Sequence, residues 1–381
     1  MSLSRRGFVR TLGLGTAGVL SSSFVIGRGR EAAAFDPQSM RVDDEVLRIG
    51  SNENARGPGA SAIQALHEVI SPRLGRGYPP DHVAELATTI AETEGVEREN
   101  VVVGTGSNPL LAASVHAFTS ADRPLVTGSP TYGSPESAAR RKGVRVRAVR
   151  VNPDLSLDLD GMATAAPGAG LLFLCNPNNP TGMAYRSGAV EDFVRLVKRR
   201  SPETTILIDE AYMDYTYDPD VRTAVPLALE IPGVFVTRTF SKAHGMAGLR
   251  VGYAIGQAET VSALSAAWHL GSMNALSAAA ATASLKDSEH IAAERVENAA
   301  VRDLVMSAFR SMGYDGPDSH ANCVFVDLGR PASWFREQCL ARGVQVGRDF
   351  PPFESSHSRI SLGTREEMER AVEVFRAVLT A

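Results

Sequence analysis

The amino-acid sequence predicts an α/β protein that has a large doubly wound, mostly parallel sheet and a smaller α+β domain. Apolar segments of strand length alternate with helical segments from residue 100 to residue 256. Several of these apolar segments lead into turns rich in glycine or asparagine, and strands and helices are mixed beyond residue 320. Strands that are joined through helices pair in parallel, and ligands of such sheets bind at the carboxyl ends of the strands.

The expected elements follow the chain in order. A strand at Leu47 leads through the turn Asn52-Glu53-Asn54 to a helix that begins near Pro58, and a second helix runs from 83 to 94. Further strands are expected at 100–103, 124–129, 144–151, 171–175, 205–209 and 233–240. Alanine-rich helices are expected from 258 to 285 and from 290 to 312. Strands at 322–327, 344–348 and 358–364, with helices after the first and last, fit the smaller domain.

Length and composition describe an ordinary globular protein. The chain has 381 residues, of which 44% are hydrophobic and 22% charged, so it can bury a large core or form two lobes. The net charge of -4 gives no electrostatic footprint for nucleic acid. The basic triplets at 140–142 and 198–200 stand where helices are expected to end. Cys175, Cys323 and Cys339 lack metal-ligand spacing and are expected to be buried free thiols, and no metal site is expected.

The first 34 residues have the layout of a cleaved export signal. Residues 4–10, SRRGFVR, resemble a twin-arginine motif, and a weakly apolar run from Leu12 to Ile26 precedes Ala32-Ala33-Ala34. We therefore expect a twin-arginine signal peptide over 1–34 that engages the twin-arginine export machinery. The mature protein would then lie in the bacterial periplasm or elsewhere outside the cytoplasmic membrane. A disordered or amphipathic N-terminal arm is the alternative.

The stretch from Thr237 to Tyr253 carries the most specific chemistry. Lys242 follows small hydroxyl residues and precedes Arg250 by eight positions. A lysine that is enclosed by apolar surface near a fixed cation loses proton affinity, and its neutral amine can form a Schiff base with a carbonyl. Thr239, Ser241 and Arg250 together could hold a phosphate. The pattern predicts an aldehyde cofactor that carries a phosphate; a solvated basic turn is the alternative.

Further candidate loops follow three other predicted strands. Gly104–Asn108 leads into a helix, where free backbone N–H groups and the helix dipole favour an anion. Asn176–Gly182 contains two prolines and three asparagines and forms a rigid loop after an apolar strand. Asp209 ends the next apolar strand, and Tyr212 stands just beyond it.

These motifs also stand in a characteristic order. Residues 175–182 read CNPNNPTG, residues 206–212 read ILIDEAY, and residues 239–253 read TFSKAHGMAGLRVGY. In these stretches the chain resembles the pyridoxal-phosphate-dependent aminotransferases of fold type I, class I/II, and most of all their histidinol-phosphate aminotransferase branch. The resemblance spans nearly all of residues 47–379. It implies the fold type I architecture and pyridoxal 5'-phosphate as the cofactor.

The resemblance also implies roles for individual residues. Lys242, Asp209 and Tyr212 would be catalytic: Lys242 forms the Schiff base and acts as general base, and Asp209 keeps the pyridine nitrogen protonated. Tyr212 and Asn179 would donate to the phenolate oxygen of the cofactor, and Tyr132 would stack on its ring. The cofactor phosphate is expected on Gly106, Ser107, Asn108, Thr239, Ser241 and Arg250.

Substrate and partner contacts are implied at further positions. Arg359, in the strand RISLGT, would clamp the substrate α-carboxylate with two parallel hydrogen bonds, and Arg348 is a weaker candidate. Asn54 belongs to a turn that lines the substrate mouth in the family. Its neighbour Arg56 would be either solvated or in contact with an acidic substrate. Tyr78 would reach the cofactor phosphate of a second subunit, which implies a homodimer with shared active sites.

The predicted function is transfer of an amino group between an L-amino acid, or a similar amine, and a 2-oxo acid through a Lys242 Schiff base. A decarboxylase or an oxidase with the same cofactor remains open, because these enzymes share Lys242, Asp209 and Arg250. A non-catalytic binding protein on this fold is a further alternative. The implied divisions are the signal at 1–34, an N-terminal arm with part of the small domain at 35–75, the large cofactor-binding domain at 76–275 and the small C-terminal domain at 276–381.

Overall fold

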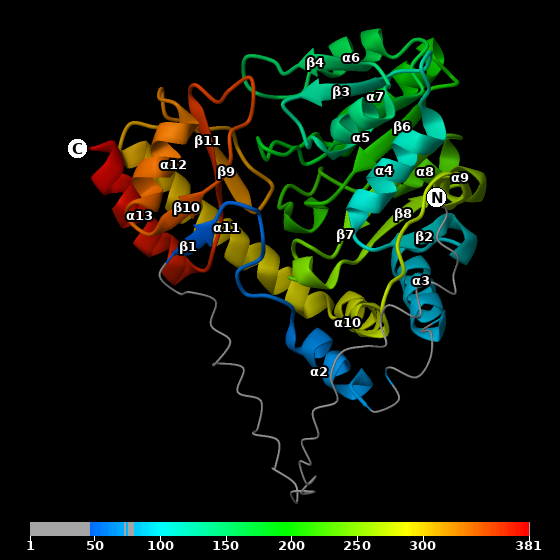
Figure 1. Cartoon of the computed structure of the whole chain (residues 1–381), viewed down its shortest axis with the longest axis horizontal. Helices are drawn as coiled ribbons and strands as arrows, with labels where there is room; N and C mark the ends of the chain where they lie inside the picture. Colours follow the sequence, from blue (N-terminus) through cyan, green and yellow to red (C-terminus); the bar gives the residue numbers. More distant parts are fainter. Residues whose placement is uncertain (1–45, 72–73, 75–79, 381) are drawn as a thin grey trace, which may run out of the picture. The chain divides into compact units, whose positions relative to one another are not determined.

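The computed structural model describes residues 46–71, 74 and 80–380, and its largest element is a seven-stranded sheet (Figure 1). The strand order is β2-β8-β7-β6-β5-β3-β4. The strands are β2 (Val101–Gly104), β3 (Leu125–Ser129), β4 (Val146–Arg150), β5 (Leu171–Cys175), β6 (Thr205–Asp209), β7 (Val234–Thr239) and β8 (Gly252–Gly256). β8 runs in the opposite direction to the other strands: its pairs with β2 and β7 are antiparallel, and the other neighbouring pairs of this sheet are parallel. The prediction of a mostly parallel sheet is confirmed.

The strands of this sheet separate two apolar layers. On β6, Ile206 and Ile208 belong to one core cluster and Leu207 to the other, because successive side chains of a strand point to opposite faces. Helices supply the outer part of both layers, which makes the fold doubly wound, as predicted. One layer contains α2 (Ala60–Val69), α3 (Pro80–Glu94), α6 (Leu159–Ala165), α7 (Ser187–Arg200), α8 (Val225–Glu230) and α10 (Ala275–Lys286). The other contains α4 (Ser107–Phe118), α5 (Ser134–Lys142) and α9 (Ala258–Ala267).

The basic triplets end helices, as predicted. Arg140-Arg141-Lys142 forms the last turn of α5, and Lys198-Arg199-Arg200 forms the last turn of α7. Lys142 donates a hydrogen bond to the carbonyl of Thr119 at 2.6 Å, where α4 has just ended. These cations therefore offset the free carbonyls and the negative dipole ends of helices.

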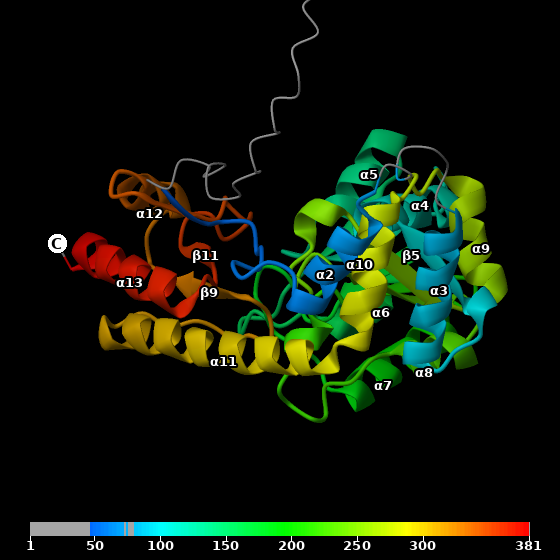
Figure 2. The same ribbon diagram turned by 90° about the horizontal axis from the view of Figure 1, so that it is seen from below.

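The remaining strands form two separate two-stranded sheets. β1 (Leu47–Ile49) pairs in parallel with β10 (Val344–Val346), and β9 (Cys323–Asp327) pairs antiparallel with β11 (His357–Ser361). Three helices share one apolar cluster with these strands: α11 (Ser288–Ser311), α12 (Ala332–Leu340) and α13 (Arg365–Leu379). α11 runs alongside α13 (Figure 2). This part has the expected α+β character, and the exact domain boundaries stay a prediction.

The chain from 258 to 285 differs from the expected helix pattern. It forms α9 and α10, which the segment Trp268–Asn274 separates. The carbonyl of Leu270 accepts hydrogen bonds from the backbone N–H and the hydroxyl of Thr105, at 2.9 and 3.1 Å. Gly271 has φ +91° and lies so close to Thr105 that a Cβ would overlap its side chain. The prediction of helix throughout this range was wrong because this tertiary contact draws the segment out of helical geometry.

Within the described ranges, none of the helices is both long and apolar enough to cross a membrane. The same residues contain no group of three or more His, Cys, Asp or Glu side chains that could hold a metal ion. All three cysteines are buried and free, as predicted.

Candidate active site

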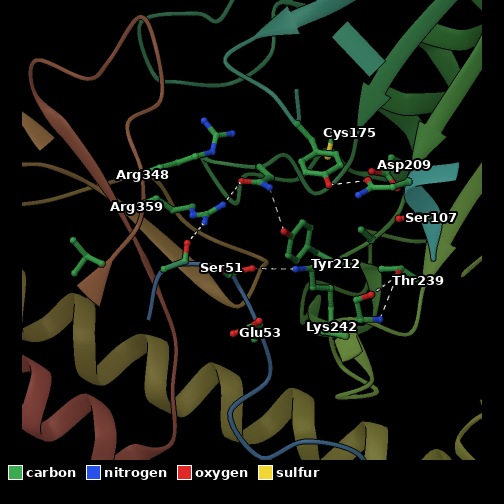
Figure 3. A pocket seen from close by; sticks show the side chains of 18 of the residues that line it. Ser51, Glu53, Ser107, Cys175, Asp209, Tyr212, Thr239, Lys242, Arg348 and Arg359 are labelled. Atoms are coloured by element: carbon green, nitrogen blue, oxygen red, sulfur yellow. Dashed lines mark hydrogen bonds between the residues drawn. The ribbon is translucent and has the colours of Figure 1, made fainter. Parts of the chain in front are cut away.

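The carboxyl ends of three parallel strands meet at one edge of the large sheet. Register pairs Cys175 at the end of β5 with Asp209 at the end of β6, and Asp209 with Thr237 on β7. The segments that follow these strands enter one cavity of about 490 Å³ (Figure 3). Its lining includes the predicted residues Ser107, Asn108, Tyr132, Asn179, Asp209, Tyr212, Thr239, Ser241, Lys242, Arg250, Arg348 and Arg359.

Lys242 extends into this cavity from the loop after β7. Its Nζ donates a hydrogen bond to the carbonyl of Asn52 at 2.8 Å and lies 5.5 Å from the centre of the Tyr212 ring. Burial, and then the positive charge of Arg359, lowers the pKa of Lys242 to about 8. The amine therefore gives up its proton far more readily than a solvated lysine, as nucleophilic and basic chemistry require.

Asp209 is only 2% exposed at the end of β6. Its Oδ1 accepts a hydrogen bond from the Thr237 hydroxyl at 2.9 Å. Burial nevertheless raises the pKa of Asp209 to about 7. A buried carboxylate is unfavourable unless a cation or several donors compensate it. A protonated ring nitrogen in the cavity would be such a partner.

Tyr212 and Asn179 are joined at the wall of the cavity. The Tyr212 hydroxyl accepts hydrogen bonds from the side-chain amides of Asn179 at 3.3 Å and Asn52 at 3.1 Å. Two accepted bonds occupy the lone pairs of the hydroxyl and leave its own hydrogen available to a ligand oxygen. Tyr132 also lines the cavity, and its hydroxyl donates to Asn108 Oδ1 at 2.8 Å.

One corner of the cavity combines hydroxyl groups, a helix start and an arginine. α4 begins at Ser107, directly after Gly106, which has φ +85°. A Cβ on Gly106 would overlap the guanidinium of Arg250. The Thr239 and Ser241 hydroxyls are 3.0 Å apart. Free N–H groups of a helix start beside hydroxyls and a guanidinium form a suitable site for a phosphate.

Arg359 extends from β11 into the side of the cavity that faces Asp209 (Figure 3). Its Nη1 donates to Asn179 Oδ1 at 2.9 Å, and its Nη2 donates to the carbonyl of Gly50 at 2.5 Å. The guanidinium lies 4.7 Å from the centre of the Phe350 ring, and that of Arg348 lies 4.3 Å from the same ring. Nε of Arg359 is buried and has no hydrogen-bond partner within the described part of the chain. A carboxylate could accept from it and remove a penalty of about 1–3 kcal/mol.

Two residues with an expected or possible substrate contact are bonded elsewhere. Asn54 Nδ2 donates to Glu294 at 2.7 Å and to the Ala243 carbonyl at 3.2 Å, so this geometry does not support its expected substrate contact. Arg56 remains partly exposed, but its guanidinium pairs with Glu294 at 2.6 Å instead of extending freely into solvent or toward a substrate. Both side chains donate hydrogen bonds to Glu294, which is buried, because a buried carboxylate requires partners. Tyr78 lies outside the described residues.

Among the residues at the site that were not predicted, three have a clear part in its geometry. Asn52 has φ +54° and contacts both Lys242 and Tyr212. Asparagine is favoured in this left-handed region, so the turn 52–54 carried a usable signal. Thr237 faces Asp209 through the pairing of β6 with β7, which the strand order could have indicated. Phe350 stands in the irregular segment after β10, which no periodic pattern marks.

The family model described as "Aminotransferase class I and II" matches residues 44–375. This chain belongs to that family. The aminotransferase is 33% identical over 337 residues to histidinol-phosphate aminotransferase of Moorella thermoacetica, a match that covers 88% of this chain and 86% of the relative. It is 34% identical over 334 residues to an aromatic amino acid aminotransferase of Nocardia farcinica, covering 86% and 90% of the two chains.

A solved structure gives the same result. The aminotransferase superposes with a TM-score of 0.80 and 26% identity on histidinol-phosphate aminotransferase from Sinorhizobium meliloti in complex with pyridoxal-5'-phosphate, covering 91% of this chain and 98% of that chain. The predicted fold type, aminotransferase activity and cofactor are confirmed.

The residues of the cavity fit pyridoxal 5'-phosphate. Asp209 is a buried carboxyl for which the described part of the chain shows no ion pair, and Lys242 is a lysine with a lowered pKa. Gly106 leaves room for Arg250 at the helix start, which suits a phosphate. We therefore expect Lys242, Asp209 and Arg250 to hold the amine-reactive, ring and phosphate portions of the cofactor.

Proposed function

We propose that this aminotransferase moves an amino group from aromatic L-amino acids to a 2-oxo acid. The observation that supports an amino acid donor is the buried Nε of Arg359, which has no hydrogen-bond partner among the described residues, in a guanidinium whose other two nitrogens are already oriented by Asn179 and Gly50. A substrate carboxylate would complete this arrangement, and a planar fork that is held in advance binds it with little further ordering.

The choice of an aromatic donor rests on the relatives and on the export that is proposed below. Relatives at 33% and 34% identity are named for histidinol phosphate and for aromatic amino acids. Histidine synthesis belongs in the cytoplasm, so an enzyme that is exported, as proposed below, is expected to act on an aromatic amino acid and not on histidinol phosphate.

Each of the chain's groups has a defined task in this reaction. When bound, the cofactor supplies an electron sink for the carbanion at the substrate α-carbon. Lys242 removes the α-proton as general base, since its lowered pKa provides neutral amine. Arg359 orients the substrate carboxylate, and Asp209 holds a negative charge in the buried end of the cavity.

The first test is the visible absorption of the purified protein after incubation with pyridoxal phosphate. We expect a visible band in the wild type that is lost in Lys242→Ala, bleaches with phenylalanine or tyrosine, and returns when a 2-oxo acid is added. Lys198→Ala is the matched control. Burial also lowers the pKa of Lys198 to about 8, but its amine donates to the carbonyl of Thr204 outside the cavity. Bleaching by histidinol phosphate and not by aromatic amino acids would reverse the substrate assignment. Bleaching without return would indicate decarboxylation or oxidation.

We also propose that the protein is exported through the twin-arginine route, on the basis of residues 4–10 and 12–34. Fusion of residues 1–40 to a reporter should direct it out of the cytoplasm. The double change Arg5→Lys with Arg6→Lys should abolish this export. Export that survives the double change would contradict the proposal.

A homodimer with shared active sites is the third proposal, and Tyr78 carries it. Lys242→Ala and Tyr78→Phe chains, each of low activity alone, should recover activity when they are refolded together. In the mixed dimer one site combines an intact Lys242 with the intact Tyr78 of the other chain. Recovery no greater than the sum of the separate variants, or a monomer by light scattering, would exclude shared sites.

A further inference from the structure

Asn54, Arg56 and Glu294 form a clasp beside the active site. Arg56 donates from Nε to Glu294 Oε1 and from Nη2 to Oε2, both at 2.6 Å. Asn54 donates to the same Oε2 at 2.7 Å, and its Oδ1 accepts from the backbone N–H of Arg56 at 3.0 Å. Glu294 lies on α11 and is 4% exposed. The carboxylate therefore fixes the turn 52–56 through three hydrogen bonds.

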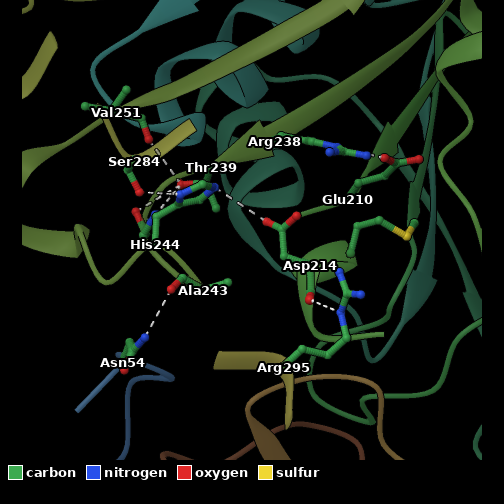
Figure 4. A network of polar contacts seen from close by, with 12 residues as sticks. Asn54, Glu210, Asp214, Arg238, Thr239, Ala243, His244, Val251, Ser284 and Arg295 are labelled. Atoms are coloured by element: carbon green, nitrogen blue, oxygen red, sulfur yellow. Dashed lines mark hydrogen bonds and ion pairs between the residues drawn. The ribbon is translucent and has the colours of Figure 1, made fainter. Parts of the chain in front are cut away.

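The clasp reaches the loop that carries the reactive lysine. The second hydrogen of the Asn54 amide is donated to the carbonyl of Ala243 at 3.2 Å, one residue after Lys242 (Figure 4). Two residues earlier in the turn, the carbonyl of Asn52 accepts from the Lys242 amine. The same turn thus binds the amine of Lys242 and the backbone carbonyl of the next residue.

The other side of the turn is anchored independently of Glu294. Asn322 donates to the carbonyls of Asn52 and Glu53, at 3.1 and 3.2 Å, and Ser361 bonds the backbone and side chain of Asn52. Without the clasp, residues 52 and 53 would stay attached to Asn322 and to β11, and Asn52 could still accept from the Lys242 amine, but Asn54 would no longer be held against the carbonyl of Ala243. Loss of the clasp would therefore mainly change the position of the lysine loop relative to this turn.

We propose that Glu294 is a positioning residue for Lys242, acting through Asn54 to hold the lysine loop against the turn 52–54. The inference takes the transamination reaction as given and assigns Asn54 to the enzyme's own geometry instead of to the substrate. Loss of the clasp should therefore impair proton transfer by Lys242 more than it impairs substrate binding.

Glu294→Gln and Asn54→Ala are the test variants, and Glu297→Gln is the control. Glu294→Gln replaces an acceptor oxygen with an N–H₂ group, which cannot accept from Arg56 or Asn54. Asn54→Ala removes the bond to Ala243 and leaves the ion pair of Arg56 with Glu294 in place. Glu297 lies one turn further along α11, is exposed and loses the same charge. We expect kcat to fall about tenfold in both test variants with donor KM within about twofold, since small displacements of reacting groups are costly. The control should match the wild type.

A second readout uses the cofactor-free protein. The rate of Lys242 labelling by acetic anhydride, followed by mass spectrometry against pH, gives the titration midpoint of its amine. Arg359, Cys323, Glu53 and Asp209 are the charged or titratable groups that act on this amine, and Glu294 is not among its principal influences. A freed amine gains water, so the midpoint should rise in both test variants and stay unchanged in Glu297→Gln.

The outcomes separate the possibilities. Unchanged kcat and an unchanged labelling midpoint in the test variants would overturn the inference, and a rise in KM alone would return Asn54 to a substrate contact. If Glu294→Gln shows no cooperative urea transition, Asn54→Ala decides. Absence of transamination in the wild type would defeat the proposed function, whereas the labelling experiment would still test the clasp.

Discussion

The amine of Lys242 donates a hydrogen bond at 2.8 Å to the main-chain carbonyl of Asn52, a residue 190 positions earlier. Asn52 is itself fixed by Ser361, which accepts from its backbone N–H at 2.8 Å, and by a bond from its side chain to Tyr212. A backbone carbonyl carries no titratable proton, so it offers the amine the same acceptor at every pH. Segments from three distant parts of the chain therefore set the position of the reacting nitrogen.

Asp209→Asn is expected to stabilise the cofactor-free protein while reducing kcat about a hundredfold or more. The pKa of Asp209 rises from 3.8 to about 7 on folding, so ionisation is disfavoured in the folded state. The destabilisation caused by the carboxyl therefore grows as the pH rises from 3.8 to about 7 and is at its maximum above pH 7. Removing it should raise the free energy of unfolding by up to about 4 kcal/mol at pH 8 and by less at pH 5. Urea unfolding at pH 5 and pH 8 measures the gain in stability, and Asp192→Asn, at an exposed position, is the control. Equal gains at the two pH values would contradict the prediction.

Arg359→Lys is expected to raise the donor KM about 10- to 100-fold, because an ammonium cannot reproduce the planar fork. Steady-state kinetics with phenylalanine measure the change. Arg348→Lys serves as the comparison, since it shares the Phe350 ring but is not the proposed carboxylate ligand. Equal effects of the two substitutions would argue against Arg359 as the carboxylate clamp.

Gly106→Ala is expected to weaken cofactor binding about tenfold or more. The added Cβ would overlap the guanidinium of Arg250, and φ +85° is strained for alanine. Displacement of one charge-assisted donor costs about 1.5–3 kcal/mol. Titration of the cofactor-free protein with pyridoxal phosphate gives the dissociation constant. Gly188→Ala is the control, because a Cβ there meets nothing within 4 Å; the same loss in both variants would refute the steric argument.

Arg238→Met is expected to lower the free energy of unfolding by about 3–5 kcal/mol, since it leaves two buried carboxylates without their cation. Arg238 pairs with Glu94 and with Glu210, each at 3.0 Å (Figure 4 shows the contact with Glu210). Arg195→Met removes exposed ion pairs to Glu191 and Glu230 and should cost much less than Arg238→Met, because solvent screens these charges. Urea unfolding compares the stabilities of the two variants. Similar losses of stability would show that the burial of the ion pairs does not govern the cost of removing the arginine.

Local sequence patterns were sufficient for the fold and for much of the cavity. Asp209 and Asn179 stand directly after apolar strands, and parallel pairing brings the ends of such strands to one edge of a sheet. Lys242 follows β7, the next strand of the same sheet. Their meeting was therefore predictable from strand order and from the polar residues at the strand ends.

Other features depended on contacts between residues far apart in sequence. Asn54 and Arg56 turn to Glu294, 240 and 238 positions away, because a buried carboxylate captures nearby donors. The segment Trp268–Asn274 leaves helical geometry because it bonds Thr105. Periodicity and motif spacing describe neighbours along the chain, and they carry no information about which distant group will lie opposite. The sequence by itself determined the elements and the chemistry at the strand ends; the tertiary structure decided which polar groups remain free for a ligand and which are used to hold the enzyme together.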